Sequence, residues 1–197
     1  MKAYLVLENG TVFCGEQFGA VTEEIGEIVF STSMGSYIEA LTDPCYHGQI
    51  LVQTYPLIGN YGMIYSDMES SKAHVKGYIV RELCDYPSNF RTDTALEDFL
   101  KEQGIMGISG VDTREITKII RSEGTMKAYI TTKEPAFDAA SEVDIKDAVS
   151  MVSTKEKYVV NENGSVKIAL LVPITICTSF LSIFKYSSYF SPLESAL

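Results

Sequence analysis

Residues 26–62 of this chain read GEIVFSTSMGSYIEALTDPCYHGQILVQTYPLIGNYG. Two runs in this stretch, Glu27–Thr32 and Gln49–Tyr55, are rich in Val, Ile and aromatic residues and are typical of β-strands. Between them, Tyr37–Leu41 predicts a short helix, and the remaining positions of the connection are crowded with small, polar and turn-forming residues.

These small and polar residues allow two interpretations. Hydroxyls and exposed backbone N–H groups near strand ends are what a protein uses to hold a polar partner. Alternatively, the Ser, Thr and Asp side chains only cap the short helix and shape its turns, which composition by itself favours. The residues are Ser31, Thr32, Ser33, Gly35, Ser36, Thr42, Asp43, Pro44 and Gly48.

Strand signals continue on both sides of this stretch. Asn9-Gly10 is a typical two-residue hairpin turn and joins the runs Ala3–Glu8 and Thr11–Phe18. Further strands are expected over Val75–Leu83 and Met126–Thr132.

Helix signals begin later in the chain. Thr94–Glu97 and Asp112–Glu115 look like capping boxes that start two amphipathic helices, and Gly104 and Gly124 are expected to end them. One or two short helices are expected over Ala136–Ser150. Strands that come first, with helices between and after them, predict packed sheets with helices covering one face.

Composition limits the class of protein. The chain has 197 residues, of which 46% are hydrophobic, and this suffices for one ordinary core. The net charge of −10 without a Lys/Arg cluster argues against a nucleic-acid partner. Four cysteines without a CxxC pair, and no signal peptide, predict reduced thiols in a cytoplasm. Two scattered histidines give no support for a metal site.

Six blocks of sequence carry a resemblance to one family. They are GEIVFSTSMGSYIEALTDPCY (26–46), GQILVQTYPLIGNYG (48–62), VKGYIVREL (75–83), PSNFR (87–91), GISGVDTREIT (107–117) and EGTMKAYI (123–130). In this order and spacing, the chain resembles the small, glutamine-using subunit of carbamoyl-phosphate synthetase. The resemblance implies the N-terminal domain of that subunit, an α/β fold with a three-layer β/β/α arrangement of mixed sheets over residues 1–152.

The remainder of the chain departs from this family. Residues 153–166 are polar and are expected to form a linker. Lys167–Val172 resembles the first strand of a class I glutamine amidotransferase domain, and the rest of 167–197 becomes an aberrant apolar tail. No Gly-x-Cys-x-Gly nucleophile turn occurs, so a truncated start of the glutaminase domain is expected. The uncharged run 168–184 is shorter than the roughly 20 residues of a membrane span and contains Pro173, which disfavours a membrane anchor.

The resemblance also implies a function. In the family, the intact small subunit hydrolyses glutamine through a Cys thioester and passes ammonia to the large subunit. The large subunit makes carbamoyl phosphate for pyrimidine and arginine synthesis, and it holds the ATP and the metal ions. We therefore expect the large subunit and glutamine as partners, no cofactor in this chain, and no activity from this chain alone.

One site residue follows from the same resemblance. The Ser of the family's TDPSY motif contacts glutamine, and the matching residue here is Cys45 in TDPCY. A Cys45–His47 pair acting as nucleophile and base lacks an evident third group, so no catalytic residue is expected. Asp43 and Pro44 are expected to shape the turn, and Asp112 to cap a helix. The alternative to the family function is a stand-alone protein-binding module of the same fold without glutamine chemistry.

Overall fold

The computed structural model of this chain describes residues 1–134, 148–156, 158–161, 163–166 and 168. It divides into two compact units, Met1–Lys146 and Asp147–Leu197, and each is described by itself. In the second unit, helix α4 (Ala148–Val152) falls at the end of the region where short helices are expected. The fold described below is that of the first unit.

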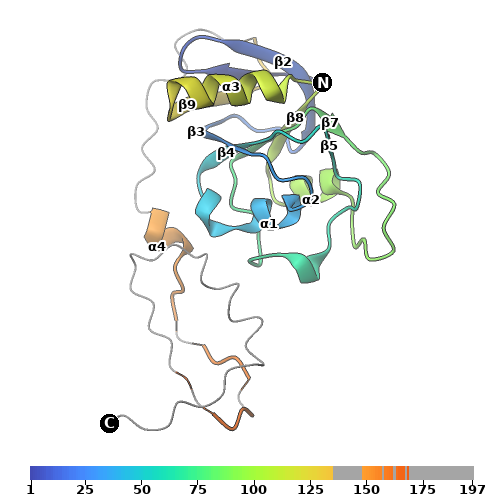
Figure 1. Ribbon diagram of the computed structural model, residues 1–197, viewed down its shortest axis with the longest axis vertical. Coiled ribbons are helices and arrows are strands. Elements are labelled where there is room, and N and C mark those ends of the chain that lie inside the picture. Colours follow the sequence, from blue (N-terminus) through green and yellow to red (C-terminus); the bar gives the residue numbers. More distant parts are fainter. Residues whose placement is uncertain (135–147, 157, 162, 167, 169–197) are drawn as a thin grey trace. The chain divides into compact units, whose positions relative to one another are not determined.

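The main strands of the first unit close into a barrel (Figure 1). In order around the barrel they are β1 (Lys2–Leu7), β2 (Val12–Gly19), β8 (Met106–Ser109), β6 (Gly77–Ile79), β4 (Gln49–Gln53), β3 (Glu24–Ser31) and β9 (Met126–Thr131). The run from β3 through β4 and β6 to β8 is parallel, and the other neighbours are antiparallel. Strands β5 (Leu57–Ile58) and β7 (Glu82–Leu83) form a separate parallel pair.

This architecture confirms the α/β class and corrects the expected layers. Separate sheets stacked on each other were predicted, whereas the structure joins the N-terminal hairpin and the parallel strands into one closed sheet. Strand β9 makes the closure, because Ile130 pairs with Leu5 of β1 on one side and with Glu24 of β3 on the other. Closure leaves no unpaired edge in the main sheet, which removes a route to aggregation.

Most of the expected strands are confirmed within a few residues. The exception is Val75–Leu83, which was predicted as one strand and divides into β6 and β7. Beyond β6, Val80 N–H still donates to the carbonyl of Ile108 at 2.9 Å, and the Arg81 carbonyl accepts from Gly110 N–H at 2.9 Å, so the chain stays bonded to the end of β8. The next residues, Glu82–Leu83, pair with β5 instead, and this change of partner divides the predicted strand.

Alternate residues of the barrel strands fill its interior. On β4, Ile50 and Val52 point inward, whereas Leu51 packs on the outside. Gly77 of β6 lies across the barrel from β9, and a Cβ there would lie 2.5 Å from Cδ1 of Ile130. The barrel is therefore packed solid by side chains. These side chains belong to a buried cluster that also takes in Val111, Ile116 and Ile120 from outside the strands. The cluster consists of Ala3, Leu5, Leu7, Ile28, Ile50, Val52, Ile79, Met106, Ile108, Val111, Ile116, Ile120, Met126, Ala128 and Ile130.

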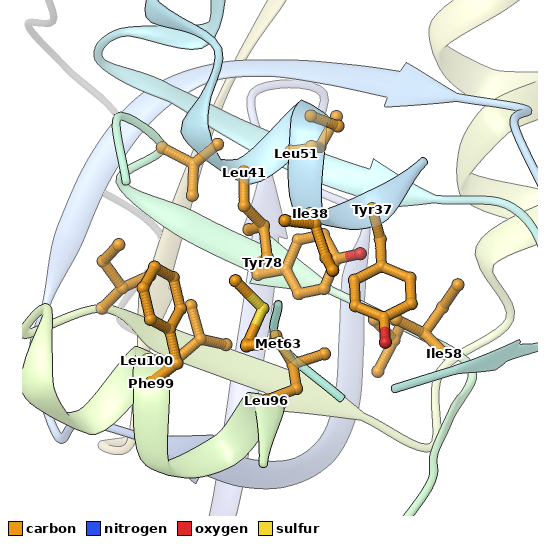
Figure 2. Packing of buried hydrophobic residues seen from close by; sticks show 14 of the residues in the cluster. Tyr37, Ile38, Leu41, Leu51, Ile58, Met63, Tyr78, Leu96, Phe99 and Leu100 are labelled. Carbon is orange, nitrogen blue, oxygen red and sulfur yellow. The ribbon is translucent and has the colours of Figure 1, made fainter. Parts of the chain in front are cut away.

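A second core lies outside the barrel, beneath helices α1 (Tyr37–Thr42) and α2 (Leu96–Glu102). Figure 2 shows the side chains of Tyr37, Tyr78 and Phe99 gathered there around Met63. The Tyr37 hydroxyl donates to the Gly62 carbonyl at 2.6 Å, so its polar end is satisfied although the residue is fully buried. This outer core holds α1, and the turn that follows α1, against the barrel.

The helix ends test the expected capping boxes. Helix α3 (Thr113–Glu123) starts as predicted, because the Asp112 carboxylate accepts the N–H groups of Arg114 and Glu115 at 3.1 and 3.0 Å, and Gly124 follows its end with a φ of 88°. The prediction for Thr94 is wrong. Helix α2 begins after Ala95 without a side-chain cap, and Thr94 instead bridges to Met63.

The expected linker (residues 153–166) and the expected amidotransferase strand (residues 167–172) are not part of the barrel unit described above. Most of residues 167–197 lie outside the described part of the chain, so the truncated amidotransferase start stays a prediction. Among the described residues, no helix has the length and apolar character needed to cross a membrane.

Candidate functional site

The turn that carries Cys45 is preorganised by its own residues. It is a single turn of 3-10 helix, η1 (Pro44–Tyr46), with Pro44 at its first position. The Asp43 carboxylate accepts the Cys45 N–H at 2.8 Å, and the Pro44 carbonyl accepts the His47 N–H at 3.1 Å. The Cys45 residue itself is exposed. The turn-shaping roles predicted for Asp43 and Pro44 are confirmed, and they present residue 45 to solvent in a fixed backbone conformation.

The buried residue Thr42, just before this turn, attaches the turn to the segment that contains Glu69 and Ser70. Thr42 is fully buried at the end of α1, where its hydroxyl donates to the Ile38 carbonyl at 2.8 Å. The same hydroxyl accepts the Glu69 N–H at 3.0 Å, and the Thr42 carbonyl accepts the Ser70 hydroxyl at 2.6 Å. The residue before Asp43 therefore cannot move without breaking buried hydrogen bonds.

His74 continues this support and was not identified from the sequence. The residue is buried. Its backbone N–H donates to the Leu41 carbonyl at 2.9 Å, and its backbone carbonyl accepts the Gly48 N–H at 3.3 Å. Its Nε2 atom lies 3.0 Å from the Ser70 hydroxyl. No sequence motif marks such a residue, because its partners are backbone groups on both sides of the Cys45 turn.

The tautomer of His74 follows from the partners of Ser70. The other contacts of the Ser70 hydroxyl are the carbonyls of Thr42 and Lys72, at 2.6 and 3.0 Å. Both can only accept, so the single hydroxyl proton goes to one of them and the oxygen accepts from Nε2–H of His74. Nδ1 is then the unprotonated ring nitrogen; it is buried, and none of the described residues forms a hydrogen bond with it.

The electrostatics of the two histidines favour neutral rings. The ring of His47 meets that of His74 edge-on, with centroids 5.9 Å apart. Burial lowers the pKa of His74 below its ordinary value of 6.5, and Lys72 and His47 act in the same direction. Burial, Lys72 and Lys76 also lower the pKa of His47. A neutral imidazole can accept a proton, but it supplies no positive charge that would lower the pKa of a neighbouring thiol.

The Cys45 turn lies at one particular end of the barrel. It leads through Gly48 into the amino end of β4, and Lys76, at the amino end of β6, donates to the Ile25 carbonyl at 3.1 Å. Strand β9 runs antiparallel to β3 and ends there, where the Thr131 hydroxyl donates to Glu23 at 3.0 Å. The end of β9 and the Cys45 turn therefore share the amino ends of the parallel strands.

The other hydroxyl-bearing residues of the opening stretch lie at the opposite end. Ser31 ends β3, Ser33 and Ser36 are joined by a hydrogen bond between their hydroxyls, and the Ser33 carbonyl accepts from the Gln53 amide at 2.6 Å. Gln53 is fully buried at the carboxyl end of β4. The polar residues of this stretch are continuous in sequence, but the structure divides them between the two ends of the barrel. Each group is held by its own hydrogen bonds.

Within the described residues, no group of three or more His, Cys, Asp or Glu side chains is placed to hold a metal ion. The fold and site define a class: an α/β barrel domain with an exposed turn at Cys45 whose backbone is held by hydrogen bonds.

Comparison with known proteins identifies the family. Residues 5–130 match the model of the CPSase domain of the carbamoyl-phosphate synthase small chain. The chain belongs to the carbamoyl-phosphate synthase small-chain family.

Individual relatives agree with this assignment. The carbamoyl phosphate synthase small chain of Clostridium perfringens is 49% identical over 175 residues, which is 87% of this chain and 50% of that protein. The small chain of Streptococcus agalactiae is 50% identical over 163 residues, covering 80% of this chain and 46% of that protein. The pyrimidine-specific small chain of Bacillus subtilis is 45% identical, covering 80% and 45%. This chain spans about half the length of the curated relatives that it matches.

Proposed function

We propose that this chain supplies the CPSase domain of a glutamine-hydrolysing carbamoyl-phosphate synthase. In this role the Cys45 turn contributes one contact to bound glutamine, and the domain docks on the large chain of the enzyme. Glutamine cleavage belongs to the half of the small-chain relatives that this chain does not match, so the chain alone is inactive. The domain acts in a cytoplasm and serves pyrimidine synthesis, arginine synthesis or both.

One observation supports the glutamine contact most directly. The Cys45 N–H is held by Asp43, the turn is anchored through Thr42, and the residue is exposed at the end of the barrel where β9 ends. In this proposal, a glutaminase domain follows the N-terminal domain of residues 1–152 through the linker over residues 153–166, and its first strand is the one expected at 167–172.

A chimera tests the proposal. Residues 1–134 replace the matching part of the Clostridium perfringens small chain, and the chimera is combined with the large chain of that organism. We expect glutamine-dependent carbamoyl phosphate formation from the chimera, and no ammonia release from glutamine by the present chain alone. A folded chimera that forms carbamoyl phosphate from ammonia but not from glutamine would contradict the proposed glutamine contact.

Binding to the large chain has its own test. Titration calorimetry of this chain with the large chain of its own organism is expected to detect a complex that weakens as salt rises, because the chain carries a charge of −10. If a folded chain shows no complex at protein concentrations of tens of micromolar, the stand-alone binding module becomes the better description.

A further inference from the structure

The backbone N–H groups of the Cys45 turn are all used inside the domain. Residues 45–48 carry four of them. The Cys45 N–H donates to the Asp43 carboxylate at 2.8 Å, and the next N–H donates to the carbonyl of the same Asp43 at 3.1 Å. The remaining two donate to the carbonyls of Pro44 and His74, at 3.1 and 3.3 Å. A hydrogen bond that residues 45–48 donate to a ligand therefore comes from a side chain.

Three side chains of the turn carry a donor, and they are not equivalent. The thiol of Cys45 is exposed, but a thiol is a weak donor. Tyr46 is half-buried and packs against the outer core. His47 is also half-buried, and no hydrogen bond within the described part of the chain involves its ring. The ring of His47 is therefore the strongest donor that this turn has left for a ligand.

The His47 ring packs against a neighbour that is itself held. Its edge meets the ring of His74 with the centroids 5.9 Å apart, and Nε2 of His74 lies 3.0 Å from the Ser70 hydroxyl. A side chain that is placed before binding loses less entropy when a ligand arrives. His47 is thus prepared for a contact two residues from Cys45, on the same turn.

The charges around His47 favour an acidic ligand group. Burial lowers the pKa of His47, and the positive charges of Lys72 and Lys76 lower it further, so the ring is neutral and carries one N–H donor. The carboxylate of Glu24 lies 3.5 Å from the Lys76 ammonium, and that of Asp43 accepts the Cys45 N–H. Both nearby carboxylates therefore already have partners, and Lys72 is exposed.

Glutamine offers one group that matches these surroundings. Its α-ammonium group would be repelled by the lysines, and its side-chain amide is neutral, whereas its α-carboxylate is anionic and only accepts hydrogen bonds. We propose that His47 is a second residue by which this turn contacts glutamine, with its ring N–H donating to the α-carboxylate beside the contact from Cys45. The inference rests on the proposed function and adds a substrate-binding residue to it.

Substitutions in the chimera described above test this inference. His47→Phe keeps a ring against His74 but has no N–H, whereas His47→Gln keeps a neutral donor. The matched control is Tyr65→Phe, which removes a donor from a ring that is 49% exposed outside the turn. The KM and kcat are measured with glutamine, and the rate of carbamoyl phosphate formation is measured with ammonia.

We expect His47→Phe to raise the KM for glutamine by at least about fivefold, because it loses a hydrogen bond to a charged group. His47→Gln and Tyr65→Phe should stay within about twofold of the unmodified chimera. The kcat with glutamine and the rate with ammonia should change little in all three variants, since the contact is to a substrate group that does not react. His47→Ala should resemble His47→Phe.

The outcomes separate this inference from the proposed function. If the unmodified chimera uses glutamine and His47→Phe leaves its KM unchanged, His47 does not contact the substrate, although the proposed function stands. If His47→Gln raises the KM as much as His47→Ala while His47→Phe does not, the ring acts by packing and the inference is wrong. If the unmodified chimera uses ammonia but not glutamine, the proposed glutamine contact fails, and this inference fails with it.

Discussion

The Ser70 hydroxyl lies 3.0 Å from Nε2 of His74, and this hydrogen bond links two residues of one loop that both support the Cys45 turn. Ser70 holds the carbonyl of Thr42 before the turn, and the His74 carbonyl holds Gly48 after it. The backbone on both sides of residue 45 is therefore held by the buried His74 and the half-buried Ser70.

Stability should depend on pH through His74. Its pKa is lowered from 6.5 in the folded chain, mainly by burial, so the unfolded chain binds the proton more readily. The stabilisation that comes from keeping this ring neutral is complete above the unfolded pKa, and it is lost as pH falls toward the lowered pKa of the folded state. We expect the free energy of unfolding, measured with urea from about pH 8 to about pH 5, to fall below pH 6.5.

Carboxylates also titrate at the acidic end of this range, so the comparison is with His74→Gln, which keeps a hydrogen-bond donor near Ser70. The variant should lose less stability than the unmodified chain between the same two pH values. The ring of His47 is less buried than that of His74, and its pKa is also lowered. The variant His47→Gln should therefore also lose less stability than the unmodified chain between these pH values, but the difference should be smaller. Equal losses in the unmodified chain and in His74→Gln would show that His74 is not responsible.

Gly15 should not tolerate a side chain. A Cβ at this position would lie 2.3 Å from the Ser109 carbonyl oxygen and 2.7 Å from Cγ2 of Ile108, because β2 and β8 run close together there. The clash is with backbone, which cannot move aside as a side-chain end can. We expect Gly15→Ala to lower the free energy of unfolding by about 1–3 kcal/mol or more in chemical denaturation.

The control for Gly15 is Gly35→Ala, where nothing lies within 4 Å of the added Cβ. That substitution should be neutral or slightly stabilising, because alanine restricts the unfolded chain. Similar losses from both substitutions would mean that general backbone effects, rather than the β2–β8 approach, decide the result.

The two expected capping boxes should respond differently to alanine. Asp112 accepts two N–H groups at the start of α3, so Asp112→Ala should cost about 0.5–2 kcal/mol in the free energy of unfolding. Thr94 provides no side-chain cap to α2, so Thr94→Ala should stay within about 0.5 kcal/mol. Urea denaturation of the two variants side by side checks the difference, and a larger loss from Thr94→Ala would reverse the assignment of the α2 start.

Cys45 should tune the glutamine contact without carrying the chemistry. In the chimera described above, Cys45→Ser supplies a better hydrogen-bond donor and should lower the KM for glutamine by about two- to tenfold, with little change in kcat. Cys45→Val should raise this KM. With ammonia in place of glutamine, all three versions should react at the same rate because the contact is bypassed. A large fall in kcat for Cys45→Ser would assign Cys45 a catalytic role.

The elements that the sequence by itself determined are those whose signals are local. The hairpin turn at Asn9-Gly10 is closed by local bonds, from Gly10 N–H to the Leu7 carbonyl and from Thr11 N–H to the Asn9 side chain, and Gly10 adopts the positive φ of 85° that such a turn requires. Asp112 caps α3 through N–H groups two and three residues away. The TDPCY residues form the η1 turn for the same reason, since Asp43 bonds to the backbone of Cys45.

The tertiary structure alone decided the features that depend on residues far apart in the chain. Barrel closure rests on Ile130 pairing with Leu5 and Glu24, and no local pattern specifies which strands become neighbours. The support of the Cys45 turn by His74 likewise depends on backbone bonds to Leu41 and Gly48, residues that lie more than twenty positions earlier in the chain. Side-chain pattern indicates which face of a strand is buried, but only the packed whole determines which strands meet and at which end a loop emerges.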